Sequence, residues 1–242
     1  MTETNEVLKQ LRERKSVRVF EDRDVPDPVK NEVIAAAFEA PTAGNMMFYT
    51  IINVTDQKIK DQLSVLCDHQ PFIAKAPLVL VFLADYQRWY ETYRAFGLTV
   101  RKPGVGDLML ACADTFIAAQ NTVVAAQSLG LGSCYIGDVL ENCEQVRALL
   151  SLPEFAMPAA MVVYGYPTRQ QLDRKKPVRF GKSHIVHENG YRKMEPDELL
   201  GMHSERGDKE SIEALCKRKY MSDFSAEMTR SVAEYLKNFS DR

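Results

Sequence analysis

Leu78-Val79-Leu80-Val81-Phe82-Leu83-Ala84 has an apolar side chain at every position, which makes it the clearest strand of the chain. A strand with this pattern is expected in a sheet that is covered on both faces. Pro77 stands directly before it, at a position where the missing backbone donor is tolerated. The segments 49–54 and 159–165 read as two further strands. We therefore predict a short sheet surrounded by helices, which is an α+β fold.

Helices are indicated on both sides of this strand by apolar spacing and by capping residues. Three apolar residues at helical spacing predict a short amphipathic helix over residues 5–14. Asp27-Pro28 predicts the start of a second helix, with Asp27 as its N-terminal cap and Pro28 in the first turn. A polar helix is expected over residues 56–66.

The longest helix is expected between Asp107, which would cap it, and Gly130, which would end it in the left-handed conformation. Apolar residues occupy most of its circumference, so we expect it to be the central buried helix. It also carries more polar groups than a membrane span tolerates. These polar residues are Asp114, Gln120, Asn121 and Gln127.

The composition limits the classes of function that the chain can have. Of its 242 residues, 45% are hydrophobic and 26% are charged, as in an ordinary soluble protein, and the formal net charge is only −2. Such a balance gives no general attraction to nucleic acid or to an anionic membrane. The cysteines and histidines show no metal-ligand spacing, so no metal is expected. The first residues form no apolar leader, so we expect a cytoplasmic location.

The C-terminal part of the chain differs from the rest. From Tyr166 to about Glu195 no long periodicity is present, and such a stretch inside a compact domain is typically functional or wraps a partner. Two helices are expected after it, over 209–219 and 223–238, and the second carries an apolar stripe that its own or a partner subunit must cover. We therefore expect a core over 1–195 and a helical extension of the same domain over 196–242.

The segment Arg14-Lys15-Ser16-Val17-Arg18 places three cations and a hydroxyl within one turn at the end of the first helix. Arginine, lysine and serine are residues that bind phosphate groups. Taken alone, the segment is more typical of a solvated helix end, where cations also suit the helix dipole. The segment Ala40-Pro41-Thr42-Ala43-Gly44-Asn45 adds small residues that allow a flat ring to approach the backbone, although a simple turn has the same composition.

Three other motifs carry little information about function. The glycines between Leu129 and Gly137 follow a helix and precede an extended segment, the reverse of a Rossmann dinucleotide site. The aromatic residues between Tyr86 and Phe96 fit a core or an interface better than a substrate pocket. The triplet Lys217-Arg218-Lys219 is typical of a solvated helix end and does not predict nucleic-acid binding.

Taken in order, these segments resemble the FMN-dependent nitroreductase family, in its NADPH-linked flavin reductase/nitroreductase branch. The likeness extends over nearly the whole chain, and the order and spacing of the segments carry it. The matching segments are Arg14 to Phe20, Ala40 to Asn45, His69-Gln70 ahead of Ala76-Pro77, Gly130 to Gly137, Tyr164 to Pro167, Lys176 to Arg179, Val186 to Asn189, and Lys217 to Phe224.

The resemblance implies a nitroreductase-like fold, with a central, mostly antiparallel sheet surrounded by helices. It further implies a homodimer that holds two FMN molecules at its interface, with each C-terminal extension wrapped over the partner. Arg14 and Arg179 would hold the FMN phosphate, with Lys15 and Ser16 beside it, and Arg18 would lie at the pyrimidine edge of the ring.

The same resemblance assigns the remaining cofactor contacts. Thr42, Ala43 and Asn45 would line the cofactor from a loop, and Gln70 would bond to the polar edge of the ring. Backbone or side chains of the segment Tyr135-Ile136-Gly137 would approach the reactive N5 atom of the flavin.

The implied activity is a ping-pong oxidoreductase. NAD(P)H would pass a hydride to flavin N5, and a small acceptor such as a nitroaromatic, a quinone or a flavin would then take the electrons. The flavin carries this chemistry, so no catalytic side chain is predicted. A non-catalytic FMN-binding protein, such as a flavin carrier or sensor, is the alternative that shares the same binding residues.

Overall fold

The structure, a computed structural model, describes residues 5–204 and 207–240. The chain divides into two compact units. The first comprises the chain up to Arg174 together with its end from Glu227 onward, and the second is Lys175–Ala226. The boundary expected at residue 195 coincides with neither limit of the second unit.

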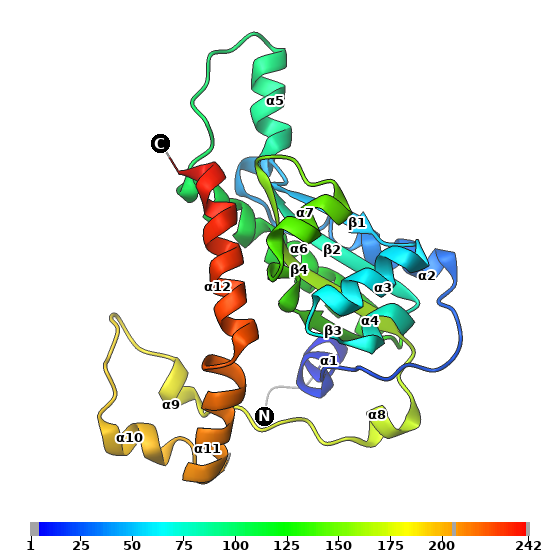
Figure 1. The fold of residues 1–242 in the computed structure, drawn as a ribbon. Coiled ribbons are helices and arrows are strands. Elements are labelled where there is room, and N and C mark those ends of the chain that lie inside the picture. The colour runs from blue at the N-terminus through cyan, green and yellow to red at the C-terminus, as the bar shows by residue number, and fades with distance from the viewer. Residues whose placement is uncertain (1–4, 205–206, 241–242) are drawn as a thin grey trace. The chain divides into compact units, whose positions relative to one another are not determined.

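A four-stranded sheet lies at the centre of the first unit (Figure 1). Its strand order is β1-β2-β4-β3, and every neighbouring pair is antiparallel. The predicted α+β class and antiparallel sheet are thus confirmed. The four strands are β1 (Tyr49–Asn53), β2 (Leu78–Asp85), β3 (Gly132–Ile136) and β4 (Ala156–Gly165).

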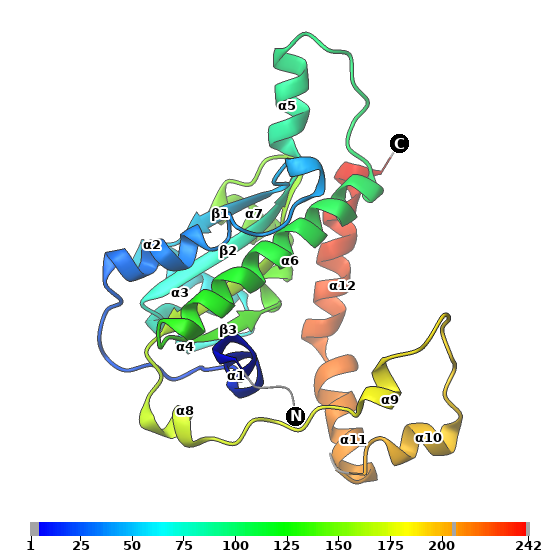
Figure 2. The same ribbon diagram turned by 180° about the vertical axis from the view of Figure 1, so that it is seen from behind.

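Helices cover both faces of this sheet, as the apolar pattern of β2 predicts (Figures 1 and 2). Successive side chains of a strand point to opposite faces. Val79 and Val81 pack into one hydrophobic cluster, while Leu80 and Phe82 pack into another on the opposite face. The first face is covered by α3 (Gln57–Leu66), α4 (Pro71–Lys75) and α7 (Cys143–Leu150), and the second by α2 (Asp27–Ala35) and α6 (Val105–Ser128).

Helix α6 is central, but it is buried on one side only. Its inner face packs against β2 and β4, whereas its outer face exposes Met109, Leu110, Phe116 and Ile117. The expectation of a central buried helix is therefore confirmed for its inner face and wrong for its outer face, which no element of the first unit covers among the described residues. Among the described residues this is the one helix long and apolar enough to cross a membrane, and its packing against the sheet is that of a core helix.

Two helix starts differ from the sequence prediction. Helix α6 begins at Val105, and Asp107 stands at its third position, where its carboxylate accepts a hydrogen bond from Gly104 N at 2.7 Å. Helix α2 has Pro26 as its cap, and Asp27 lies inside the first turn without a capping hydrogen bond. Gly130 has φ +77°, which confirms the predicted left-handed stop after α6.

The remaining elements are short. They are α1 (Glu6–Glu13), α5 (Gln87–Ala95), α8 (Arg169–Asp173), and the 3-10 turns η1 (Ala43–Asn45) and η2 (Asp138–Leu140). The second unit contains α9 (Lys182–Ile185), α10 (Pro196–Gly201), α11 (Lys209–Leu215), the π-turn Cys216–Tyr220 and the first residues of α12 (Asp223–Leu236). A final 3-10 turn, η4 (Lys237–Phe239), follows α12.

The end of the chain packs against the core of its own subunit. Tyr235 of α12 is fully buried, and Phe239 of η4 is 3% exposed and meets the ring of Phe155 edge-on at 5.7 Å. This part of the predicted apolar stripe is therefore covered within the chain.

Candidate functional site

The segment that follows α1 docks along β3. Ser16 and Ser133 form a parallel bridge, and Val17 N donates to Ser133 O at 2.9 Å. A side chain at Gly132 would place its Cβ 2.6 Å from a methyl carbon of Val17, so this close approach requires glycine. The contact fixes the cationic segment at the start of β3.

Three arginines converge near Cys134 of β3. Burial raises the pKa of the Cys134 thiol, while Arg18, a hydrogen bond with Ser16, Arg14 and Arg174 act in the opposite direction. Neither Arg14 nor Arg18 forms an ion pair within the part of the chain that the structure describes. The Nε atom of Arg14 is buried without a hydrogen-bond partner. The start of β3 therefore carries positive charge that the described residues leave uncompensated.

Lys15 has a different surrounding from its neighbours. Its ammonium group donates to Leu172 O at 2.6 Å and also to Arg174 O, while the Arg174 guanidinium donates to Ser16 O. These bonds tie the cationic segment to the end of α8. A cavity of about 350 Å³ lies beside it, and Val17 and Gln171 are among the residues that line it.

The Thr42 loop, defined as residues 42–48, is held by one buried carboxylate on α6. Asp114 is 3% exposed and accepts hydrogen bonds from the Thr42 hydroxyl, from Ala43 N at 3.1 Å and from Phe48 N at 3.3 Å. The backbone adopts positive φ at Gly44, Asn45 and Met47. Such angles persist only where surrounding contacts hold the chain, and Asp114 supplies these contacts.

Asp114 is a positioning residue that the sequence analysis missed. It appeared there only as a polar group in an apolar helix. A carboxylate on the inner face of such a helix needs hydrogen-bond donors, because an unpaired buried charge is costly. A carboxylate in this apolar helix was therefore the signal that the sequence offered. The sequence does not show which donors form hydrogen bonds to it.

Helix α5 also supports the Thr42 loop. The indole nitrogen of Trp89 donates to Met46 O at 2.6 Å, and the ring of Tyr86 stacks on Phe48 with centroids 4.8 Å apart. The expected role of the aromatic group in packing is confirmed for these residues, which join a hydrophobic cluster with Phe155.

The predicted residues of β3 differ in what they offer a ligand. Ile136 is 2% exposed, so its side chain belongs to the core. Tyr135 is partly buried, its hydroxyl donates to Gln120 Oε1 at 3.4 Å, and burial raises its pKa to about 12. A Cβ at Gly137 would meet no atom within 4 Å, so the backbone there is open to a flat ligand.

Gln70 stands at the other end of β3. It caps α4, and its side-chain nitrogen donates to Asp138 Oδ2 at 2.7 Å and to Cys67 O at 2.9 Å. Asp138 directly follows Gly137. Gln70 is thus separated from the cationic segment by the length of β3, a distance of roughly 17 Å for five residues.

The Thr42 loop does not reach the cationic segment within one chain. Asp114 holds the loop at the first half of α6, whereas Arg14 lies beside Val123 and Gln127 near the helix C-terminus. From the rise of an α-helix, these places lie roughly 14 to 20 Å apart along its axis. The structure therefore groups the predicted residues into two halves, with Arg14, Ser16, Arg18, Gln70 and Tyr135–Gly137 along β3, and Thr42, Ala43 and Asn45 elsewhere.

Arg179 lies in the second unit, where it is exposed. Its predicted contact with a phosphate stays a prediction.

The half-site along β3 fits a phosphorylated planar ligand. Uncompensated arginines and a serine hydroxyl stand at one end of the strand, where the buried Nε of Arg14 lacks an acceptor. An open glycine and an amide side chain stand at the other end. Positive charge at one end suits phosphate, and exposed backbone at the other suits the edge of a ring.

Comparisons with known proteins agree with this geometry. The model of the nitroreductase family matches residues 11–166. An FMN reductase [NAD(P)H] of Bacillus subtilis is 31% identical over 234 residues, which cover 96% of this chain and 91% of that protein. An oxygen-insensitive NADPH nitroreductase of Salmonella typhimurium is 32% identical over 193 residues, which cover 79% of this chain and 77% of that protein.

Among solved structures, the NfrA1 nitroreductase from B. subtilis is similar, with a TM-score of 0.77 and 27% sequence identity. The similarity covers 96% of this chain and 92% of that one. The protein is thus an α+β protein with the nitroreductase fold. The chain belongs to the nitroreductase family.

Proposed function

We propose that this chain is an FMN-dependent NAD(P)H oxidoreductase that reduces small acceptors of the nitroaromatic, quinone or flavin type. The observation that carries the proposal is the uncompensated cluster of Arg14 and Arg18 beside β3, in a chain of this family. Bound FMN supplies the ability to take a hydride from NAD(P)H and to pass two electrons to an acceptor.

The residues of the chain bind and orient the cofactor. Arg14 and Ser16 hold the phosphate, and Lys15 keeps the segment against α8 through its backbone contacts. Arg18 places a fixed charge at the pyrimidine edge, where reduction adds negative charge, and so favours the reduced cofactor. Gln70 bonds to the polar edge of the ring, and the segment Tyr135-Ile136-Gly137 approaches the flavin near its reactive N5 atom.

The site is completed by a second copy of the chain. The outer face of α6 exposes Met109, Leu110, Phe116 and Ile117, and apolar patches of this kind mark interfaces. A twofold interface over this face pairs the first half of one α6 with the second half of the other. The Thr42 loop of one subunit, with Ala43 and Asn45, then meets the cationic segment of its partner.

The C-terminal extension is assigned a role in the same dimer. The second unit, Lys175–Ala226, exposes apolar residues such as Tyr191, Leu200 and Tyr220. In the homodimer the part of this unit beyond residue 196 covers the partner subunit. The enzyme acts in the cytoplasm, where NAD(P)H is available, and its partners are small molecules and not nucleic acid or a membrane.

The test is the visible spectrum of the purified protein reconstituted with FMN, recorded without oxygen before and after NADPH. Flavin absorbance that bleaches with NADPH and returns on addition of a nitroaromatic or a quinone supports the oxidoreductase. An Arg18→Ala variant is expected to bind FMN more weakly and to be reduced more slowly. Glu32→Gln, an exposed change on α2, serves as the control.

Two results would contradict this proposal. Bands that persist with both NADPH and NADH indicate the alternative, a non-catalytic FMN carrier or sensor. A protein that fails to take up FMN overturns both assignments, because each depends on the half-site along β3.

A further inference from the structure

Two carboxyl groups lie near Gln70, at the two ends of the 3-10 turn η2 that follows β3. Asp138 begins this turn and Glu141 follows it, with Glu141 N donating to Asp138 O at 3.0 Å. Side chains three residues apart in a 3-10 turn lie one above the other. Glu141 is 5% exposed, and its Oε1 atom has no hydrogen-bond partner among the described residues.

The contacts of Gln70 determine which end of its amide group is left for a ligand. Its nitrogen donates to Cys67 O and to Asp138 Oδ2. A backbone carbonyl and an ionised carboxylate are both acceptors only, so the amide nitrogen, and not the oxygen, must face them. Both amide hydrogens are used in these two bonds. Gln70 therefore has its amide oxygen to offer a ligand.

The surroundings of Glu141 are acidic. Burial raises the pKa of Glu141 to about 7, and Asp138, Asp68 and Glu227 act in the same direction. The thiol of Cys67 also faces this group, and burial raises its pKa far above neutrality. Neither carboxyl group of the Asp138–Glu141 pair forms an ion pair within the described part of the chain.

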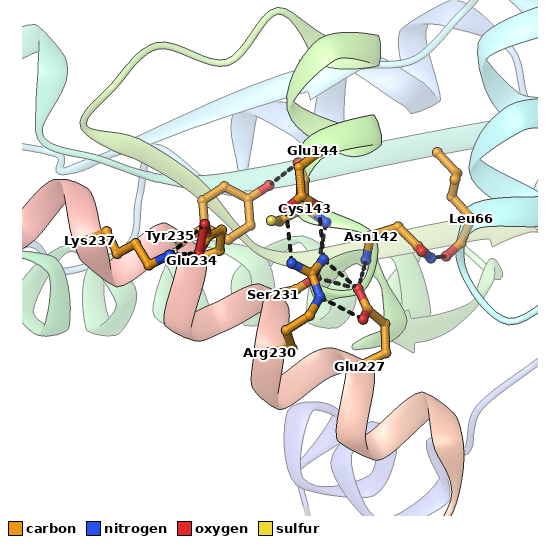
Figure 3. Close-up of polar contacts among 10 residues, drawn as sticks. All are labelled: Leu66, Asn142, Cys143, Glu144, Glu227, Arg230, Ser231, Glu234, Tyr235 and Lys237. Carbon is orange, nitrogen blue, oxygen red and sulfur yellow. Dashed lines mark hydrogen bonds and ion pairs between the residues drawn. The ribbon is translucent and has the colours of Figure 1, made fainter.

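The cation on the nearby helix α12 is engaged elsewhere. Arg230 forms bonds of 2.8 Å to both carboxylate oxygens of Glu227 and two bonds, at 2.9 and 2.8 Å, to Glu144 (Figure 3). Glu227 also accepts from Asn142 N, directly beside Glu141 in the chain. Glu141 therefore faces acidic groups without a cation of its own.

The pair has two protonation states with different consequences for Gln70. With Glu141 neutral, its hydroxyl donates to Asp138, which carries one negative charge and accepts from Gln70. When Glu141 loses its proton to solvent, two buried carboxylates face each other, and their repulsion favours separation. Asp138 then moves away from Glu141, and the hold on Gln70 loosens.

We propose that Asp138 and Glu141 are positioning residues that fix the Gln70 amide with its oxygen toward the bound ring, where it accepts a hydrogen bond from the N3–H group of the isoalloxazine. The proton that the pair shares maintains this arrangement. The inference rests on the proposed function, because Gln70 meets this ring only when FMN occupies the half-site.

The first test follows the titration of the Asp138–Glu141 pair in the full-length apoprotein. The side-chain NH₂ resonances of Gln70, assigned by their loss in Gln70→Ala, are followed by ¹H–¹⁵N NMR between pH 5.5 and pH 8.5, a range of about 1.5 units on either side of the expected midpoint near 7. We expect them to titrate in the wild type and in Glu32→Gln. We expect no such titration in Glu141→Gln, whose amide donates to Asp138 but does not ionise.

The second test measures the FMN dissociation constant by flavin fluorescence over the same pH range. The constant of the wild type is expected to rise several-fold between the acidic and the alkaline end, relative to that of Glu141→Gln. Ionisation of the FMN phosphate affects both proteins equally and cancels in this ratio. Asp138→Asn, which keeps an acceptor oxygen but lacks the charge, is expected to weaken binding across the range.

Each result bears on one proposal or the other. Gln70 resonances that do not titrate in the wild type, or that titrate equally in Glu141→Gln, overturn the carboxyl pair. The Gln70 resonances can titrate while the ratio of the FMN dissociation constants of the wild type and Glu141→Gln stays constant. That result overturns the proposed hydrogen bond between Gln70 and the ring. Failure of the wild type and of every variant to bind FMN overturns the proposed function, and the NMR titration still tests the pair.

Discussion

Asp114 is the residue on which the shape of the Thr42 loop depends. Its carboxylate accepts three hydrogen bonds from a loop with positive φ at three successive or nearly successive positions. Hydrogen bonds to a charged group contribute more than neutral ones, and a buried donor left without a partner adds a further cost. This loop therefore depends on a side chain that lies on another element, in addition to the support from α5.

Replacement of this carboxylate is expected to destabilise the protein. Asp114→Asn removes the charge and one acceptor oxygen, at a cost of about 2 kcal/mol. For a chain of this size the melting temperature should fall by roughly 4 to 8 °C, as measured by circular dichroism. Asp61→Asn, which changes an exposed contact to Gln57, is the control and should shift it little. Equal falls in melting temperature for the two variants would show that Asp114 contributes no more to stability than an exposed carboxylate does.

Glu141 gives the stability of the apoprotein a specific pH dependence. Its pKa is raised to about 7 in the folded protein, above its ordinary value in an unfolded chain. The unfolded state releases this proton at lower pH, so folding stability falls as the pH rises from about 4.5 to about 7 and is then constant. The loss is on the order of 2 to 3 kcal/mol.

Urea unfolding at several pH values measures this dependence. Glu141→Gln is expected to abolish that part of the slope while Glu32→Gln retains it. A wild type whose free energy of unfolding does not fall relative to that of Glu141→Gln over this range would contradict the assignment.

At the scale of elements, α12 shows how two kinds of contact anchor one helix to the core (Figure 3). Arg230 forms an exposed network with Glu144 and Glu227, whereas Tyr235 is fully buried two turns away from Glu227. Exposed ion pairs contribute little to stability because water and salt screen them. Burial of a large aromatic side chain contributes far more.

Substitutions in α12 should separate these two contributions. Tyr235→Ala is expected to lower the free energy of unfolding by about 3 to 5 kcal/mol, measured by urea unfolding. Arg230→Ala should change it far less. Tyr235→Phe should also change it little, because the lost hydrogen bond to Cys143 O is long, at 3.4 Å. A larger loss for Arg230→Ala than for Tyr235→Ala would show that charge, and not burial, holds the helix.

The elements of the first unit were largely predictable from the sequence. The apolar run of β2 indicated a strand covered on both faces, and Gly130 marked the stop after α6 at a backbone angle that glycine favours. The start of α2 was misplaced because Pro26, which carries no capping side chain, occupies the cap. The burial of α6 was overestimated, because the composition of a helix does not show which of its faces the neighbouring elements cover.

The site was less predictable, and the reason lies in long-range contacts. The cationic segment and β3 are far apart in sequence, and the docking of this segment against Gly132 and Ser133 brings them together. Spacing gives no information on such pairs, so resemblance to a family supplied them. Asp114 and Asp138 went unnoticed for the same reason, because their partners lie on other elements.

For the whole molecule, the proposed dimer makes a complete site depend on the outer face of α6. A charge placed in this face should prevent association of two chains. Phe116→Asp is expected to give a monomer in sedimentation velocity, with FMN affinity at least ten-fold weaker, since about 1.4 kcal/mol or more of contacts from the Thr42 loop is lost. Val65→Asp, at an exposed apolar residue of α3, is the control and should stay dimeric. A monomer with unchanged FMN affinity would show that one chain suffices.

The separation of the two half-sites along α6 also has a genetic consequence. A chain damaged only in the cationic segment, such as Arg14→Ala/Arg18→Ala, still carries an intact Thr42 loop, and a chain with Thr42→Asp carries the reverse. Each homodimer has two defective sites, whereas a mixed dimer has one site built wholly from undamaged parts. Random pairing of co-expressed chains should restore roughly one quarter of wild-type activity. Two alleles that each abolish the enzyme would then complement one another in the same cell.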